Sequence, residues 1–248
     1  MSVETRTDPD RTGAGGLAAD RDRALRRTAK ATGGWYLALG IIGILGFVLV
    51  RPRLHVDGDP AATLANLVGD AGLARIGLVL ELGLVTAQAV TSVWFYRLFR
   101  QANPNAAWAI GGFGLVNSVA VLVSAVFMTT ALAVAGDPGL APNGDTAATA
   151  QLLFELSTNS WGAGGLFFGL WLIPMGHVAA GSGLMPVWLG RILIIGGVGY
   201  ILSAFLSYGL SSPPTWLIEG LVIPATVGEF WMIGYLLVVG VRRPARVG

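Results

Sequence analysis

Long apolar stretches alternate with short polar segments along the chain. Six stretches have the length, or nearly the length, needed to cross the roughly 30 Å hydrocarbon core of a bilayer, which takes about 20 residues of helix. They cover residues 34–50, 73–96, 107–134, 152–179, 188–209 and 217–240. Backbone groups in lipid must form their hydrogen bonds within the segment, so each stretch is predicted to be a helix. We expect an all-α, polytopic integral membrane protein with six transmembrane helices.

The composition supports a membrane protein. Hydrophobic residues make up 54% of the 248 residues and charged residues only 12%, whereas soluble domains carry about 25% charged residues. A large soluble helical bundle would need polar faces on the same helices, and these faces are largely missing. The chain has no cysteine, which excludes disulfides, thiolate metal sites and cysteine nucleophiles.

The basic residues are distributed unequally between the two sides of the predicted bundle. Most of the sixteen lie in the N-terminal tail, after the second span, before the fifth span or at the C-terminus, which are all on one side. The other side has only Arg51, Arg53 and Arg75. Because basic residues favour the cytoplasmic side, we expect both termini in the cytoplasm of a bacterial plasma membrane.

The polar tails flank a single predicted transmembrane domain, residues 34–241. The first 33 residues are expected to be unstructured up to about Asp20, followed by a basic helix, "DRDRALRRTAKA", that lies on anionic headgroups or only sets the topology. Acidic residues interrupt the basic run, so nucleic acid is not an expected partner. Residues 242–248 form a second cytoplasmic tail.

Two connecting segments on the outer side carry helix-capping signals. Asp59 can cap a short helix that has Pro60 at its first position and ends near Gly69. The segment 136–146 is rich in turn residues and is expected to be an exposed loop. Asp145, near its end, can cap the helix of the fourth span.

Four acidic residues fall inside spans or at their edges. Glu155 and Glu219 lie near the ends, Glu81 lies roughly 12 Å deep at 1.5 Å per residue, and Glu229 is near the middle. An isolated charge at this depth costs roughly 2.5–3.5 kcal/mol, and protonating a glutamate at pH 7 costs about 3.7 kcal/mol. The two costs are similar, so the protonation state stays open. Glu81 and Glu229 are candidates for a functional site or for buried structural hydrogen bonds.

Other polar residues share helix faces with these acids. Gln88 lies on the face of Glu81, Asn159 lies on the face of Glu155, and Asn117 is inside the third span. These residues either line a polar cavity that opens to the outside or hold helices together, at about 0.6 kcal/mol per interhelical hydrogen bond. The glycine face of the fourth span is expected to serve close helix packing.

Two further residues complete the candidate set. Arg75 is expected to form an ion pair at the outer rim, with Glu155 or Glu219. His177 lies at the cytoplasmic end of the fourth span and is expected to form an interfacial hydrogen bond. Metal-binding, phosphate-binding and serine-nucleophile motifs are missing from the sequence, so we predict no catalytic residue, metal or cofactor.

Several segments resemble a known family. They are "RLHVDGDPAATLANLVGDAGLARIGLV" (53–79), "YRLFRQANPNAAW" (96–108), "FFGLWLIPMGHVAAGSGLMPVWLGRILIIGGVGYILSAF" (167–205) and "PATVGEFWMIGYLLVVG" (224–240). Together they are similar to a family of bacterial membrane proteins catalogued as domain of unknown function 4386. The resemblance covers about residues 27–242. It implies a six-helix membrane fold and no particular activity.

The favoured hypothesis is binding or transport of a small solute or a proton through a polar cavity between helices. The alternative is a non-catalytic membrane partner or regulatory protein. An intramembrane enzyme acting on lipid is a third possibility, although no nucleophile stands out. Apart from the lipid bilayer, the sequence leaves open the substrate, the protein partners and the oligomeric state.

Overall fold

The first transmembrane segment begins earlier than its apolar stretch. In the computed structural model, which describes residues 9–242, helix α1 covers Pro9–Gly43 and continues through a π-helical segment, Ile44–Val50, into the short helix α2, Arg51–Leu54. The expectation of an unstructured tail up to Asp20 is therefore wrong for residues 9–20, and the part before them lies outside the described residues. Adding a residue to an existing helix is inexpensive, and the Ala- and Arg-rich tail favours helix.

Five more long helices follow. They are α4 (Ala71–Phe99), α5 (Pro104–Gly136), α6 (Thr146–Gly181), α7 (Val187–Gly209) and α8 (Thr215–Val238). Together with Ala19–Leu54 they make six helices in the described part of the chain that are long and apolar enough to cross a membrane. The predicted all-α fold with six transmembrane helices is confirmed.

The predicted caps are present. The Asp59 side chain accepts a hydrogen bond from the Ala62 amide at the start of α3 (Pro60–Gly69), and Asp145 accepts one from the Ala148 amide at the start of α6. Segment 136–146 contains two short 3₁₀ turns, η2 (Pro138–Leu140) and η3 (Pro142–Gly144). Each cap satisfies an amide that the first helical turn leaves unpaired, which fixes where these helices begin.

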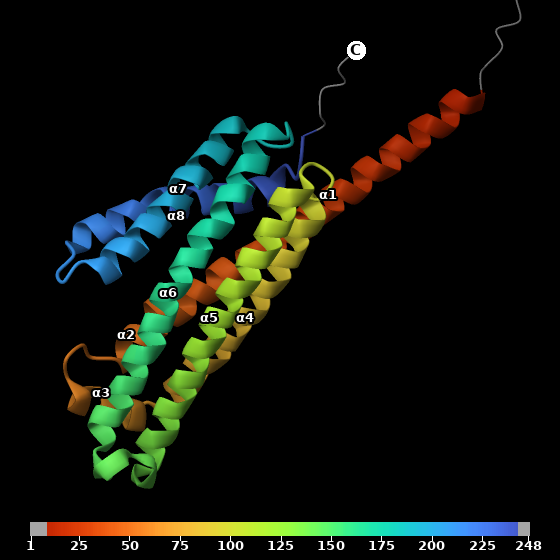
Figure 1. The fold of residues 1–248 in the computed structure, drawn as a ribbon. Coiled ribbons are helices and arrows are strands. Elements are labelled where there is room, and N and C mark those ends of the chain that lie inside the picture. Colours follow the sequence, from red (N-terminus) through yellow and green to blue (C-terminus); the bar gives the residue numbers. More distant parts are fainter. Residues whose placement is uncertain (1–8, 243–248) are drawn as a thin grey trace, which may run out of the picture.

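The transmembrane helices form a ring. Each packs against its neighbours in the sequence, and α8 returns to pack against α1, so the order around the bundle is α1, α4, α5, α6, α7, α8. Helices α4, α5 and α6 run side by side, and the α7–α8 hairpin is inclined to them (Figure 1). We call the side where α1 begins and α8 ends the terminal side. The opposite side, which carries α3, is called the α3 side.

Glycines allow close approach of α6 and α7. A Cβ atom on Gly169 would lie 2.6 Å from the carbonyl oxygen of Gly197, and one on Gly176 would lie 2.5 Å from that of Gly190. Real Cβ atoms do not approach a backbone oxygen this closely, so only glycine fits. The packing role predicted for the glycine face of α6 is confirmed at these two positions.

Aromatic rings close the bundle toward the terminal side. The rings of Tyr36, Phe95 and Trp171 meet edge to face, with centroids 5.4–5.7 Å apart. All three side chains are buried, with at most 1% exposed. Phe99 extends this aromatic cluster along α4. Edge-to-face pairs of aromatic rings are favourable beyond the area that they bury, so the cluster packs tightly between the helices toward the terminal side.

Candidate functional site

A cavity of about 760 Å³ lies within the ring on the α3 side of the aromatic cluster. Side chains from all six transmembrane helices line it. It extends from Tyr36 to Tyr208 and Ile218, which are close to the connection between α7 and α8. Tyr208 is 56% exposed, so the cavity reaches the protein surface at this end. Ile44, Val48 and Phe230 also line the cavity and are 43%, 60% and 56% exposed, so the exposed part of its lining extends along the first transmembrane segment and α8, and the aromatic cluster lies at its terminal end.

Glu229 projects into this cavity from α8. Its carboxylate accepts a hydrogen bond from the Tyr36 hydroxyl, with 2.7 Å between the two oxygens. Gly228 precedes it, and a Cβ there would lie 2.9 Å from Leu193 of α7. Close packing of α7 on one face of α8 and the tyrosine on α1 therefore hold Glu229 in place. Its side chain is only partly buried, as expected for a group that lines a cavity.

Three other predicted site residues line the same cavity. Gln88 and Asn117 are buried, and the Gln88 side-chain nitrogen has no hydrogen-bond partner within residues 9–242. Asn159 is exposed at the rim, where its backbone oxygen accepts a hydrogen bond from Tyr208. The structure thus brings four of the predicted residues, Glu229 included, around one space. A buried amide without a partner is costly, so Gln88 has unused capacity to bind a ligand.

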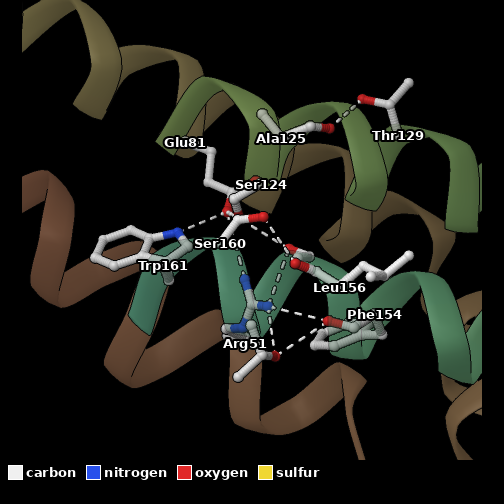
Figure 2. Close-up of polar contacts among 11 residues, drawn as sticks. Arg51, Glu81, Ser124, Ala125, Thr129, Phe154, Leu156, Ser160 and Trp161 are labelled. Carbon is white, nitrogen blue, oxygen red and sulfur yellow. Dashed lines mark hydrogen bonds and ion pairs between the residues drawn. The ribbon is translucent and has the colours of Figure 1, made fainter. Parts of the chain in front are cut away.

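Glu81 belongs to a different, more tightly packed group. Its Oε1 atom accepts hydrogen bonds from Ser124 at 2.9 Å and from the Trp161 indole nitrogen at 3.0 Å, and Arg51 Nη1 lies 3.4 Å away (Figure 2). Ser124 also contacts Ser157 of α6 at 2.8 Å. We call these five residues the Arg51 cluster. It joins the end of the first transmembrane segment to α4, α5 and α6.

Arg51 is held by several groups at once. Its Nη2 atom donates to Ser157 at 3.0 Å and to Thr158 at 2.8 Å, and its guanidinium lies 4.7 Å from the ring centre of Phe154. The Arg51 and Glu81 side chains are only 13% and 10% exposed. Neutralisation by Glu81, together with these two hydroxyl acceptors and the ring, offsets the cost of taking the charge out of water.

The predicted role of Arg75 is wrong. Arg75 is exposed and has no ion pair among the described residues. The first transmembrane helix continues as far as Leu54, so it carries Arg51 into the bundle, where the sequence indicated a loop. Arg75 instead lies in the first turns of α4 and faces away from the bundle.

The two acids at the edges of spans also differ from the prediction. Glu155 lies 3.1 Å from the His55 Nε2 atom and accepts a hydrogen bond from Gln151, also at 3.1 Å. The His55 ring stacks on Phe154, with ring centres 4.5 Å apart. Glu219 is exposed. Glu155 is thus part of a polar rim on the α3 side, with histidine as its partner.

His177 lies apart from both groups. It is exposed near the terminal end of α6, and its predicted interfacial hydrogen bond is not formed with any described residue. Within the described chain, no three His, Asp or Glu side chains gather closely enough to hold a metal ion. The candidate site is therefore the cavity around Glu229, with the Arg51 cluster beside it.

Trp161 separates the two deep carboxylates. It lines the large cavity and also a small pocket of about 30 Å³ next to Arg51 and Glu81. Phe47 and Leu84 line both spaces as well. Glu81 and Glu229 therefore do not share one cavity. The two spaces adjoin, because Gly43 also lines both and Thr158, which lines the large cavity, accepts a hydrogen bond from Arg51 at 2.8 Å.

Sequence reasoning missed the residues that hold the carboxylates. Trp35 and Tyr36 at the start of the first span are typical of an interfacial aromatic belt, which gives no reason to place Tyr36 at a site, and Arg51 entered only as one of the basic residues on the outer side. Trp161, at mid-span in α6, carries a polar N–H group that needs a partner when buried. That requirement predicts an acceptor nearby but does not identify Glu81.

Comparison with known proteins identifies one family. A family model described as "Domain of unknown function (DUF4386)" matches residues 31–240. These residues include all six transmembrane helices, apart from the start of the first. No curated protein and no solved structure matches the chain.

Proposed function

Because the chain belongs to the family described as DUF4386, whose description names no activity, we propose from the cavity itself that the protein binds a small solute there and carries it, or a proton, across the membrane. The observation that carries this proposal is the cavity of about 760 Å³ with Glu229 on its wall. Sites for small molecules commonly measure about 300–1,000 Å³ and combine apolar walls with a few polar groups. This cavity has both features.

The energetics of the carboxylates favour a role for Glu229 beyond helix packing. Glu81 has a cation and two further hydrogen-bond donors around it. Among the described residues, Glu229 has a single hydrogen-bond donor, Tyr36. An ionisable group at membrane depth with so little compensation is costly. Such a residue is a reasonable binding or proton-carrying group.

Transport would require a second conformation. The aromatic cluster lies between the cavity and the terminal side, so passage to that side would require these rings to separate. In alternating access, one group of helices rocks against another around a fixed site. The inclined α7–α8 hairpin (Figure 1) is the group that we expect to move.

The proposal includes the location and orientation of the protein. We place it in a bacterial plasma membrane with the terminal side in the cytoplasm. Arg97, Arg100 and Arg191 are exposed on the terminal side. Arg51 is engaged in the bundle, which leaves Arg53 and Arg75 as the exposed arginines on the α3 side of the described chain. The imbalance of exposed basic residues supports a cytoplasmic terminal side.

Thiol labelling tests whether the cavity is accessible to water. The chain has no native cysteine, so single cysteines can be placed without background. Ser203 is buried and lines the cavity, whereas Ser118 is equally buried and does not. We expect a small water-soluble methanethiosulfonate to label Ser203→Cys and not Ser118→Cys. Equal protection of both would mean a dry cavity, and the solute proposal would lose its basis.

One observation favours a second function, that of a non-catalytic membrane partner. The first part of α1 projects beyond the other helices on the terminal side (Figure 1). Arg21, Arg23, Arg26 and Arg27 are exposed there. Deleting residues 1–30 would abolish capture of partner proteins by crosslinking if this were the function. Unchanged crosslinks and an unchanged phenotype would exclude it.

A further inference from the structure

We propose that the solute is a hydrophobic organic cation, such as an ammonium or phosphonium ion that carries alkyl or aryl groups. This inference rests on the proposed function of the cavity and specifies the chemical class of its ligand. It follows from three properties of the residues that line the cavity: the sign of their charge, the aromatic rings among them and the apolar character of most of the wall.

The charge of the lining is of one sign. Among the described residues that line the cavity, Glu229 is the sole carboxylate, and Lys, Arg and His are absent. The positive charge of Arg51 is already engaged by Glu81, on the other side of Trp161. Glu229 is therefore a partly buried acid without a cationic partner among residues 9–242, and a cationic ligand would supply one.

Aromatic rings form much of the wall. Phe168 and Tyr200 lie with ring centres 5.1 Å apart, and Phe47 and Trp161 lie 4.7 Å apart. Tyr36, Tyr208 and Phe230 also line the cavity. The faces of such rings attract cations, with Trp the strongest, and the attraction increases where water is excluded. Aromatic rings around one carboxylate are the usual surroundings of a bound organic cation.

Other ligand classes fit less well. An anion would meet an uncompensated carboxylate and no basic residue. A sugar or another highly polar solute would need hydrogen-bond partners on all sides, whereas 16 of the 27 residues that line the cavity are glycine, aliphatic, Phe or Trp. Apart from Glu229 and the tyrosines, the polar side chains are Gln88, Asn117, Thr158, Asn159, Ser203, Ser207 and Thr226, and those of Thr158 and Thr226 already form hydrogen bonds within the protein. Burying polar groups without partners is costly. An apolar cation can pair its charge with Glu229 and contact the apolar and aromatic side chains of the wall with its alkyl or aryl groups.

Two probes of nearly the same shape and opposite charge test the inference. Tetraphenylphosphonium is the cation and tetraphenylborate is the anion. Binding of each to the purified full chain in detergent is measured by equilibrium dialysis. We expect saturable binding of the cation at least about tenfold tighter than that of the anion, a factor that corresponds to 1.4 kcal/mol. This comparison uses the unaltered chain and so does not depend on how any variant folds.

A matched pair of variants tests the role of the carboxylate. Glu229→Gln removes the acid in the cavity, and Glu219→Gln removes an exposed acid on the same helix that does not line it. We expect Glu229→Gln to weaken cation binding about tenfold or more and Glu219→Gln to leave it unchanged. Phe168→Leu, which removes a wall ring and no charge, is expected to weaken binding several-fold. Equal effects of the two glutamate variants would overturn the inference.

A variant that fills the cavity tests whether a solute binds there at all, separately from whether that solute is a cation. Ala204 lines the cavity at some distance in sequence from Glu229, and Ala204→Trp is expected to abolish binding of any solute there. If the anion binds as well as the cation and Ala204→Trp abolishes both, the cavity binds solutes but the cation inference is wrong. If Ala204→Trp changes the binding of neither probe, or if neither probe binds, the proposed solute cavity is wrong as well.

Discussion

The hydroxyl of Tyr36 and the carboxylate of Glu229 lie 2.7 Å apart, although 193 positions separate them in the sequence. Their hydrogen bond joins the first transmembrane helix to the last and so closes the ring of six. It lies between the aromatic cluster and the cavity, because Tyr36 belongs to the cluster and also lines the cavity. The closure of the bundle and the candidate site therefore share one contact.

Substituting Tyr36 separates the effect of its hydroxyl from that of its ring. Tyr36→Phe removes the hydrogen bond to Glu229 and is expected to lower the free energy of unfolding by about 1 kcal/mol. Tyr36→Ala also removes the ring from Phe95 and Trp171 and is expected to cost about 3–5 kcal/mol. Unfolding in mild detergent by added SDS measures both. Equal losses for the two variants would mean that the ring contributes nothing.

Removal of Arg51 is expected to be far more damaging than removal of Arg75. Arg51→Gln leaves Glu81 without its cation and should cost about 3–5 kcal/mol of unfolding free energy. Arg75→Gln, at an exposed position, should change it by no more than about 0.5 kcal/mol.

The double substitution Arg51→Leu with Glu81→Leu removes both charges from the Arg51 cluster. It should recover much of the loss, because replacing both members of a buried pair by apolar residues is often close to neutral. A double variant that is as unstable as the sum of its two single variants would show that Arg51 and Glu81 do not stabilise each other.

Two glycines near the contact of α7 and α8 should respond to alanine in opposite ways. A Cβ on Gly199 would overlap the carbonyl oxygen of Leu221, whereas one on Gly220 meets no atom within 4 Å. Gly199→Ala is expected to cost about 1–3 kcal/mol through overpacking. Gly220→Ala should be neutral or stabilising by up to about 1 kcal/mol, because alanine favours helix. Midpoints of thermal unfolding are the measurement, and similar midpoints would contradict this packing.

Orientation can be determined in intact cells. Asn143 lies in the α5–α6 connection on the α3 side, and Ser182 lies in the α6–α7 connection on the terminal side. With the terminal side in the cytoplasm, a membrane-impermeant maleimide should label Asn143→Cys in intact cells and Ser182→Cys only after lysis. The reverse pattern would place the termini outside.

The helices could be predicted from the sequence because lipid imposes a simple condition. A segment that crosses the bilayer must be apolar over about 20 residues and must pair its own backbone groups. This condition is local, and so are the caps of Asp59 and Asp145, which depend on residues three positions away. The six helices and several of their ends therefore follow from the order of the residues alone.

The partners of the buried charges could not be predicted in this way. Which arginine meets Glu81 depends on where the first helix ends. The structure extends that helix through a π-helical segment to Leu54, and this extension brings Arg51 into the bundle and leaves Arg75 outside it. The sequence indicated Arg75 as a partner for Glu155 or Glu219 and assigned no cation to Glu81, because contact in space depends on the packing of four helices.

By itself, the sequence determined that the protein is a six-helix membrane protein and that Glu81 and Glu229 lie deep within it, since hydrophobicity and depth are properties of single segments. Only the tertiary structure decided that the two acids occupy different surroundings. Glu81 is neutralised by Arg51 and accepts a hydrogen bond from Trp161, whereas Glu229 faces a cavity and accepts a hydrogen bond from Tyr36 alone among residues 9–242. The reason is physical: charge compensation acts over a few ångströms, between residues that folding brings together from distant parts of the chain.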